Sequence, residues 1–213
     1  MINEIEARVL GSLVEKQLTT PEYYPLTLNS LTAACNQRSN RDPVMSLGET
    51  EVLAAIDSLR DKNLVYLFHG STSRTVKYKH MLPSVLELEP EETAIITLLL
   101  LRGPQTVGEL RGRSERLYDF RSLDEVQQTL DALARRSEPL VARLERSPGQ
   151  KEPRYAHLFS GEPDVSKLAN AETPRPSRDD TSAIDELRNE FLALKDELEK
   201  LKGEFAEFRK QFE

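Results

Sequence analysis

The feature that most constrains the fold of this chain is an internal repeat within its first 161 residues. Four short segments recur in the same order, and the offset between matched segments changes only where Pro, Asn and Ser residues indicate loops. Such drift is expected of a duplicated module whose loops differ in length. The chain is therefore expected to contain two copies of one module. The matched segments are Glu6–Leu10 with Glu92–Ile96 (offset 86), Pro25–Leu31 with Pro104–Leu110 (79), Val52–Leu59 with Val126–Leu133 (74), and Lys77–Leu82 with Arg154–Phe159 (77).

Each copy predicts three helices followed by two strands. In the first copy, apolar residues at spacings of three and four predict a first helix with one face toward a core. Thr27 is expected to cap the second helix, with Ser30 three residues further on. The third helix is predicted over residues 48–62. The expected core residues are Ile2, Ile5, Val9 and Leu13 in the first helix and Val52, Ile56 and Leu59 in the third.

Two runs rich in β-branched and aromatic residues, Leu64–Phe68 and Thr75–Tyr78, flank a polar turn and predict a β-hairpin. In the second copy, strands are predicted near residues 140–145 and 154–159, around a Ser-Pro-Gly turn. Three helices with a terminal β-hairpin form the winged variant of the helix-turn-helix. We therefore predict a mainly α fold with small β-hairpins, made of tandem winged helix-turn-helix domains at residues 1–84 and 85–161.

Short strings spread over residues 1–162 match those of a known family. The most distinctive are Ala34-Cys35-Asn36-Gln37 and Asn40-Arg41-Asp42-Pro43-Val44-Met45. The others are Glu6-Ala7-Arg8-Val9, Glu15-Lys16-Gln17, Thr19-Thr20-Pro21, Tyr24-Pro25-Leu26, Leu100-Leu101-Arg102-Gly103, Gly108-Glu109-Leu110-Arg111, Arg154-Tyr155 and His157-Leu158-Phe159-Ser160-Gly161-Glu162. In these strings the chain resembles the YceH-like family of uncharacterised bacterial proteins. The resemblance implies a bacterial tandem winged-helix protein, and it implies no particular activity.

The last 52 residues differ in character from the repeat. Residues 162–182 are polar with three prolines, which predicts a flexible linker. Residues 183–213 then carry apolar side chains at alternating spacings of three and four over four heptads, the a and d pattern of a coiled coil. The predicted oligomerisation residues are Ile184, Leu187, Phe191, Leu194, Leu198, Leu201, Phe205, Phe208 and Phe212.

The charges beside this seam indicate the orientation of the strands. Every e position is basic, whereas three of the four g positions are glutamate. In a parallel pair, g of one chain lies near e of the next heptad of its partner, so that opposite charges meet, whereas an antiparallel pair would oppose like charges. We predict a parallel coiled-coil homodimer. The alternative is a helix that folds back on the modules of its own chain.

The composition indicates a cytoplasmic protein. Cys35 is the only cysteine and cannot form an intramolecular disulfide, which favours a reducing compartment. The N-terminal residues lack the basic and apolar regions of a signal peptide. The longest strongly apolar run, Ala94–Leu101, is too short to cross a bilayer, so no membrane association is expected.

The residues that usually carry catalysis are scarce. The chain has three histidines and no His-Glu-x-x-His or paired-cysteine motif, so we expect no metal site. It also lacks a phosphate-binding glycine loop and a Gly-x-Ser-x-Gly motif. His80 and His157 occupy the same position of the repeat, and Cys35 lacks a neighbouring His or Lys, so structural roles are expected for all three. We predict a protein that is not an enzyme and uses no cofactor.

The third helices, which enter the major groove in winged-helix proteins, begin with acidic residues in both copies. Carboxylates there oppose contact with phosphates. The candidates for contact with DNA or a partner lie instead in the turns before the third helices and in the wings. They are Asn36, Gln37, Arg38, Asn40 and Arg41 in the first turn, Arg74, Lys77 and Lys79 in the first wing, Arg111, Arg113, Arg116 and Arg121 in the second turn, and Lys151 and Arg154 in the second wing.

Two functions from different classes are consistent with these patterns. The first is a dimeric, DNA-binding regulator-like protein that contacts phosphates through its turns and wings, and four arginines within residues 111–121 favour it. The second is a protein-interaction scaffold whose winged helices dock partner proteins, as tandem winged helices do in chromosome-condensation complexes. The acidic third helices and the net charge of −7 favour the scaffold. We prefer DNA as the ligand.

Overall fold

The computed structural model describes residues 1–69, 75–145 and 152–161, together with Lys202. The chain divides into two compact units, Met1–Val165 and Ser166–Glu213. The predicted linker at 162–182 and the predicted coiled coil at 183–213 lie outside the described residues, except that Lys202 is helical and exposed. Every other described residue belongs to the first unit.

The described part of the chain is mainly helical, with two small antiparallel sheets. The first repeat contains β1, β2 and β3 in one sheet with the order β1-β3-β2, and the second contains the pair β4-β5. A short helix, α4, connects the two repeats. In chain order the elements are α1 (Glu4–Thr19), a 3-10 turn (Pro21–Tyr23), β1 (Leu26–Thr27), α2 (Leu28–Cys35), α3 (Glu49–Asp61), β2 (Val65–Phe68), β3 (Lys77–His80), α4 (Leu82–Leu86), α5 (Pro90–Arg102), α6 (Val107–Ser114), α7 (Leu123–Ala134), β4 (Val141–Arg143) and β5 (Tyr155–His157).

Local residue patterns predicted most of these elements correctly. Thr27 caps α2, because its side chain accepts a hydrogen bond from the backbone N–H of Ser30. The prediction of a third helix over 48–62 is confirmed by α3 with its flanking cap residues. The predicted second strand was placed too early, since β3 begins at Lys77 and ends at His80. The strand β1 and the helix α4 were not predicted, because two or five residues carry too little periodicity.

The repeat is visible in the hydrogen bonds as well as in the order of elements. Both first helices begin with a capping box, formed by Asn3 with Glu6 in α1 and by Glu89 with Glu92 in α5. Leu26 of β1 pairs with Tyr78 of β3. The equivalent residues of the second repeat, Gln105 and Tyr155, form an isolated antiparallel bridge. The same local contacts therefore shape both copies.

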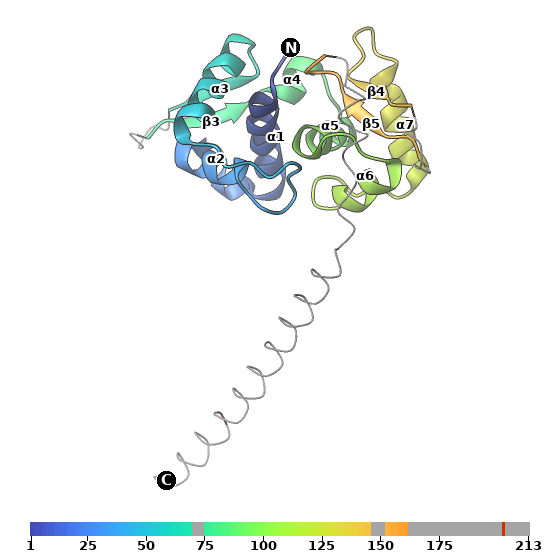
Figure 1. The fold of residues 1–213 in the computed structure, drawn as a ribbon, viewed down its shortest axis with the longest axis horizontal. Coiled ribbons are helices and arrows are strands. Elements are labelled where there is room, and N and C mark those ends of the chain that lie inside the picture. Colours follow the sequence, from blue (N-terminus) through green and yellow to red (C-terminus); the bar gives the residue numbers. More distant parts are fainter. Residues whose placement is uncertain (70–74, 146–151, 162–201, 203–213) are drawn as a thin grey trace. The chain divides into compact units, whose positions relative to one another are not determined.

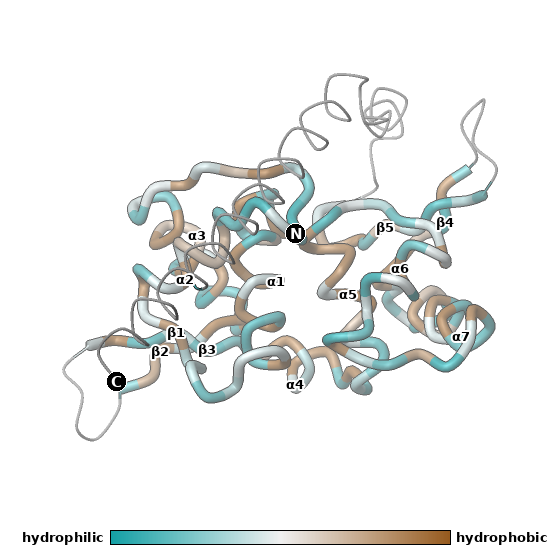
Figure 2. The backbone as a smooth tube through the Cα atoms, turned by 90° about the horizontal axis from the view of Figure 1, so that it is seen from below, coloured by the Kyte–Doolittle hydropathy of each residue, from teal (hydrophilic) through white to brown (hydrophobic). Residues whose placement is uncertain are grey.

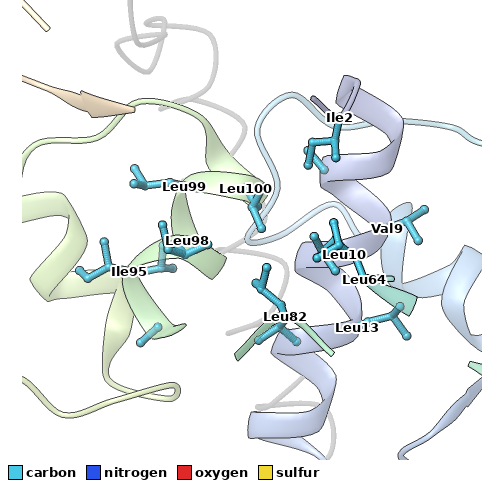
Figure 3. Close-up of a cluster of buried hydrophobic side chains, with 14 of the residues drawn as sticks. Ile2, Val9, Leu10, Leu13, Leu64, Leu82, Ile95, Leu98, Leu99 and Leu100 are labelled. Carbon is cyan, nitrogen blue, oxygen red and sulfur yellow. The ribbon is translucent and has the colours of Figure 1, made fainter. Parts of the chain in front are cut away.

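The helices α1 and α5 lie side by side at the centre of the unit, and the remaining helices and strands of each repeat flank them on opposite sides (Figures 1 and 2). Ten consecutive residues are buried in each, Glu6–Glu15 in α1 and Glu92–Leu101 in α5. Side chains of both helices, among them Leu10 and Leu100, contribute to one apolar cluster (Figure 3). The expectation of a single buried face for the first helix was therefore incomplete, because α5 covers the face of α1 turned away from its own repeat.

Gly11 allows these two helices to approach closely. A Cβ atom at this position would lie 2.9 Å from Cγ of Leu101 and 3.1 Å from Cβ of Leu100. A contact of 2.9 Å is shorter than Cβ atoms make in packed proteins, and one of 3.1 Å is unusually tight, so a side chain at residue 11 would displace the α5 side chains that it meets. Glycine is therefore required by the packing of the two repeats against each other.

Polar contacts also join the repeats. The N–H of Ile2 donates to the carbonyl of Phe159 at 2.8 Å, and the N–H of Asp42 donates to the carbonyl of Leu101 at 3.0 Å. The side chain of Arg102 donates to Oδ1 of Asn40. These bonds tie the start of the chain and the loop after α2 to the second repeat.

Candidate functional site

The loop between α2 and α3, which holds the first set of candidate residues, is fixed by hydrogen bonds. The side-chain amide of Asn36 donates to the carbonyl of Leu47 and accepts from its N–H, both at 2.8 Å. The guanidinium of Arg8, which is 2% exposed, donates to the carbonyls of Cys35 (3.1 Å) and Pro43 (2.6 Å). The distinctive Cys-Asn-Gln and Asn-Arg-Asp-Pro strings are thus held in place by buried side chains.

Arg41 lies inside this loop. It is 5% exposed, and its two terminal nitrogens donate to the two carboxylate oxygens of Glu15 at 3.0 and 2.6 Å. Its Nε and Nη2 also donate to the carbonyl of Ala34. A bidentate pair of this kind orients both side chains strongly. Of the candidates in this turn, Arg38 and Asn40 are exposed, whereas Asn36 and Gln37 are half-buried.

The second set of candidates lies at the end of α6 and in the segment that leads to α7. Arg111 donates to the carbonyls of Phe120 (3.4 Å) and Arg121 (3.3 Å). Arg113 donates to Oε1 of Gln105 at 2.7 Å and lies 3.5 Å from Glu109. Arg116 and Arg121 are exposed. This segment therefore presents cations on its surface.

The structure brings the two turns together. A cleft of about 320 Å³ is lined by Gln37 and Asn40 from the first turn and by Arg113 and Arg116 from the second. The cations Lys16, from the end of α1, and Arg102, from the end of α5, also line it. The carboxylates in its lining are Glu15 and Glu115, and the former is already paired with Arg41. Positive charge therefore exceeds negative charge at the cleft.

Sequence reasoning missed Lys16 and Arg102. A usable signal was present, because the offset of 86 between the first helices of the repeats aligns these two residues. The offset of 79 likewise aligns Gln37 with Arg116. The cleft is therefore lined from equivalent positions of the two repeats, and a basic residue ends the first helix in both copies.

Arg102 is the most constrained cation of the cleft. Its Nε atom is buried and has no hydrogen-bond partner among the described residues. Burial lowers the pKa of Arg102, and the neighbouring charges of Arg113 and Arg41 lower it further, while Asp42 and Glu15 oppose that effect. Arg102 is therefore a partly buried cation with two further arginines close enough to act on its charge.

The hairpin candidates differ in their surroundings. In the β2–β3 register, Tyr66 pairs with Lys79 and Phe68 pairs with Lys77, so these four side chains share one face of the sheet. Tyr66 and Phe68 are 49% and 44% exposed. Arg154 in the second repeat is engaged by the carbonyl of Pro104 and by Glu109, each at 2.8 Å. Arg74 and Lys151 lie outside the described residues.

The outer faces of α3 and α7 are acidic, as their composition predicted. Glu49, Glu51, Asp57 and Asp61 of α3 are exposed, and so is Asp124 of α7. Gln127, a residue suited to reading adenine, instead bonds to the carboxylate of Asp131 (2.8 Å) and the hydroxyl of Tyr155 (2.9 Å).

The cysteine and two of the histidines, all outside the cleft, lie in surroundings that keep them uncharged at pH 7. Burial raises the pKa of the Cys35 thiol to about 11, which keeps it protonated. Burial lowers the pKa of His80 and of His157 to about 4, so both are neutral at pH 7. Among the described residues, no group of three or more His, Cys, Asp or Glu side chains could hold a metal ion.

Within residues 1–69, 75–145 and 152–161, no helix has the length and apolar character needed to span a membrane.

Similar proteins occur in several bacteria. Residues 2–150 match the family described as "Protein of unknown function, DUF480". A UPF0502 protein of Geobacter sulfurreducens is 50% identical over 217 residues, covering 100% of this chain and 99% of the relative. A UPF0502 protein of Citrifermentans bemidjiense is 55% identical over 186 residues (87% and 86%), and one of Shewanella piezotolerans is 46% identical over 212 residues (98% and 97%).

Proposed function

The chain belongs to the DUF480 family of proteins of unknown function, and we propose that it is a non-enzymatic DNA-binding protein made of two winged-helix modules. The order of three helices and an antiparallel pair of strands, found in both repeats, supports the winged-helix assignment. We place the modules at residues 1–84 and 85–161.

The observation that carries the proposal is the exposed basic segment after α6, which meets the loop after α2 of the first repeat at one cleft. Exposed Arg116 and Arg121 of the second repeat lie on the same segment as Arg113, which lines the cleft with Lys16 and Arg102. The exposed cations of this segment, Arg116 and Arg121, suit the phosphates of a DNA backbone, which supply most of the affinity in sequence-independent binding. Lys77 and Lys79 on the first wing would extend this contact. We leave Arg41 and Arg154 out of the surface, because carboxylates and carbonyls engage both of them.

The mode of binding follows from the acidic third helices. Carboxylates on the outer faces of α3 and α7 would repel a DNA backbone, and Gln127 is occupied within its own module. Base reading through these helices is therefore disfavoured. We propose contact with the DNA backbone and little preference for sequence.

Fluorescence anisotropy with a labelled 30-base-pair duplex tests the proposal. We expect affinity to fall steeply with salt, with a slope of log K against log salt of about −0.9 for each phosphate contacted. The double variant Arg116→Gln/Arg121→Gln should make that slope less negative by the equivalent of about two phosphate contacts. Arg135→Gln, which removes an equally positive side chain that is 79% exposed at the end of α7, is the matched control. Binding that is absent at low salt, or equally weakened by the control, contradicts the proposal.

We further propose that residues 183–213 form a parallel homodimeric coiled coil, tethered to the modules by residues 162–182. The e and g charges support this orientation, and dimerisation would double the number of DNA-contacting modules for each particle. Light scattering should give a dimer mass for the full chain and a monomer mass for a chain ending at Gly161. A monomeric full chain would contradict the dimer and favour a tail that folds back.

A specific observation favours the second candidate function, a protein-interaction scaffold. Apolar side chains are exposed close to the acidic face of α3, namely Leu53 (39%), Tyr66 (49%), Leu67 (37%) and Phe68 (44%). Exposed apolar groups of this kind often mark a protein interface. If the full chain binds no DNA at low salt, affinity purification from native cells should recover a stoichiometric partner that Tyr66→Ser/Phe68→Ser loses.

A further inference from the structure

The cleft between the repeats has properties that contact with DNA does not explain. Its volume of about 320 Å³ lies within the range of sites for small molecules. It is lined by the ends of three helices, α1, α5 and α6, and by the loop after α2, so both repeats contribute to it. A ligand in this cleft would touch both halves of the unit.

The charges around the cleft are incompletely balanced. Glu15 is paired with Arg41 and lies 3.7 Å from Lys16, while Glu109 lies close to both Arg113 and Arg154. Two of the carboxylates in and beside the cleft are thus each shared by two cations. Arg102 donates a hydrogen bond to the side-chain amide of Asn40, and its buried Nε has no hydrogen-bond partner within the described ranges. Arg116 adds a further exposed cation to the lining of the cleft.

An anion between these side chains would relieve two unfavourable features at once. It would offset the repulsion between Arg102 and Arg113, and it would offer acceptors to the donors of Arg102. Guanidinium groups bind phosphate oxygens through short, charge-assisted hydrogen bonds, and Lys binds phosphate as a point charge. A phosphate group fits this donor set better than a carboxylate, because it presents more acceptor oxygens to cations that converge from several sides.

We propose that this cleft is a binding site for a small phosphate-bearing ligand, held between Lys16 and Arg102 on one side and Arg113 and Arg116 on the other. The ligand's own apolar or polar part would contact Leu98 and Gln37, which also line the cleft. The site does not depend on DNA binding. The same phosphate chemistry could, however, be supplied by a DNA backbone, and the experiment separates the two sources.

The test is isothermal titration of the full chain with pyrophosphate at constant ionic strength. We expect one site for each chain. Arg102→Gln and Arg116→Gln should each weaken binding about tenfold or more, about 1.4 kcal/mol, since each removes charge-assisted hydrogen bonds to the phosphate oxygens. Arg116 is exposed, so its variant keeps the test valid if Arg102→Gln proves unstable. Arg135→Gln is the matched control and should leave pyrophosphate binding unchanged.

Arg102→Gln is then titrated with the labelled duplex, because Arg116 is expected to contact both ligands. If Arg102→Gln weakens pyrophosphate binding and leaves DNA affinity within twofold, the cleft is a separate small-ligand site. Parallel loss of pyrophosphate and DNA binding in Arg102→Gln overturns the separate site and assigns the cleft to the DNA backbone. Absence of pyrophosphate binding, or an equal loss in Arg135→Gln, overturns the proposal whether or not the protein binds DNA.

Discussion

Mild acid should destabilise the first unit through His80, and the effect can be isolated by comparison with His80→Phe. His80 ends β3, is 3% exposed, and its ring centroid lies 5.8 Å from that of Tyr24. Both ring nitrogens are buried without a hydrogen-bond partner among the described residues. Burial, and to a lesser degree the charge of Lys79, lowers the pKa of His80 from 6.5 to about 4.

The sign of the effect follows from proton linkage. Between pH 6.5 and 4 the unfolded chain binds a proton at His80 and the folded chain does not, so the free energy of unfolding falls as the pH falls through this window. Above pH 6.5 the contribution is fully present, and below pH 4 the loss levels off. Lowering the pKa of His80 from 6.5 to about 4 corresponds to about 3.4 kcal/mol in all, with about 1.4 kcal/mol lost by pH 5.5.

Urea denaturation followed by circular dichroism at pH 7.5, 5.5 and 4 measures this loss. The carboxylates of the protein also titrate in this range, so the informative quantity is the difference in unfolding free energy between wild type and His80→Phe. Relative to its value at pH 7.5, this difference should shift in favour of the variant by about 1.4 kcal/mol at pH 5.5 and about 3 kcal/mol at pH 4. Parallel pH profiles for the two proteins would refute the assignment of a buried neutral histidine. Burial also lowers the pKa of His157 to about 4, and its contribution cancels in the comparison because His80→Phe leaves His157 unchanged.

Three further predictions test the packing. Gly11→Ala should lower the free energy of unfolding by about 1–3 kcal/mol, because its Cβ would collide with α5. The control Gly112→Ala, whose new Cβ meets no neighbouring atom within 4 Å, should raise the free energy of unfolding by up to about 1 kcal/mol. Equal effects of the two variants in urea denaturation would contradict the close approach of α1 and α5. Arg41→Met should lower the free energy of unfolding by about 3–5 kcal/mol, because it leaves the buried carboxylate of Glu15 without its bidentate partner. The control Arg38→Met, at an exposed residue, should change the free energy of unfolding by less than about 0.5 kcal/mol in the same assay. The Cys35 thiol should stay unreactive toward Ellman's reagent at pH 8 until guanidinium unfolds the chain, because it is buried and its pKa is raised to about 11. Rapid labelling of the native protein would contradict this expectation and would show that the loop after α2 opens.

The candidate site was only partly predictable from sequence. The second basic turn was found because four arginines gather within residues 111–121, and its exposed members Arg116 and Arg121 remain in the proposed surface. Arg38 and Arg41 looked alike in sequence, yet one is exposed and the other is buried against Glu15. Whether a charged side chain is buried or exposed depends on which atoms surround it. The carboxylate that pairs with Arg41 belongs to Glu15 of α1, more than 20 residues earlier in the chain.

What the sequence determined by itself was local. Caps such as Thr27 and Asn3, and apolar spacings such as that of Val52, Ile56 and Leu59, act over three or four residues, so helices and strands could be predicted where they form. The repeat extended this to the order of elements in both halves.

Only the tertiary structure decided how the two copies meet. In α1 the charged residues Glu6, Arg8 and Glu15 interrupt the apolar stripe, yet all three are buried. Their partners lie in the first repeat, in the loop after α2 for Arg8 and Glu15 and at the end of α3 for Glu6. The face of α1 turned away from its own repeat is covered by α5, at a distance that Gly11 permits. That packing depends on contacts between residues about 90 positions apart, which no local pattern encodes, and it is also what creates the cationic cleft.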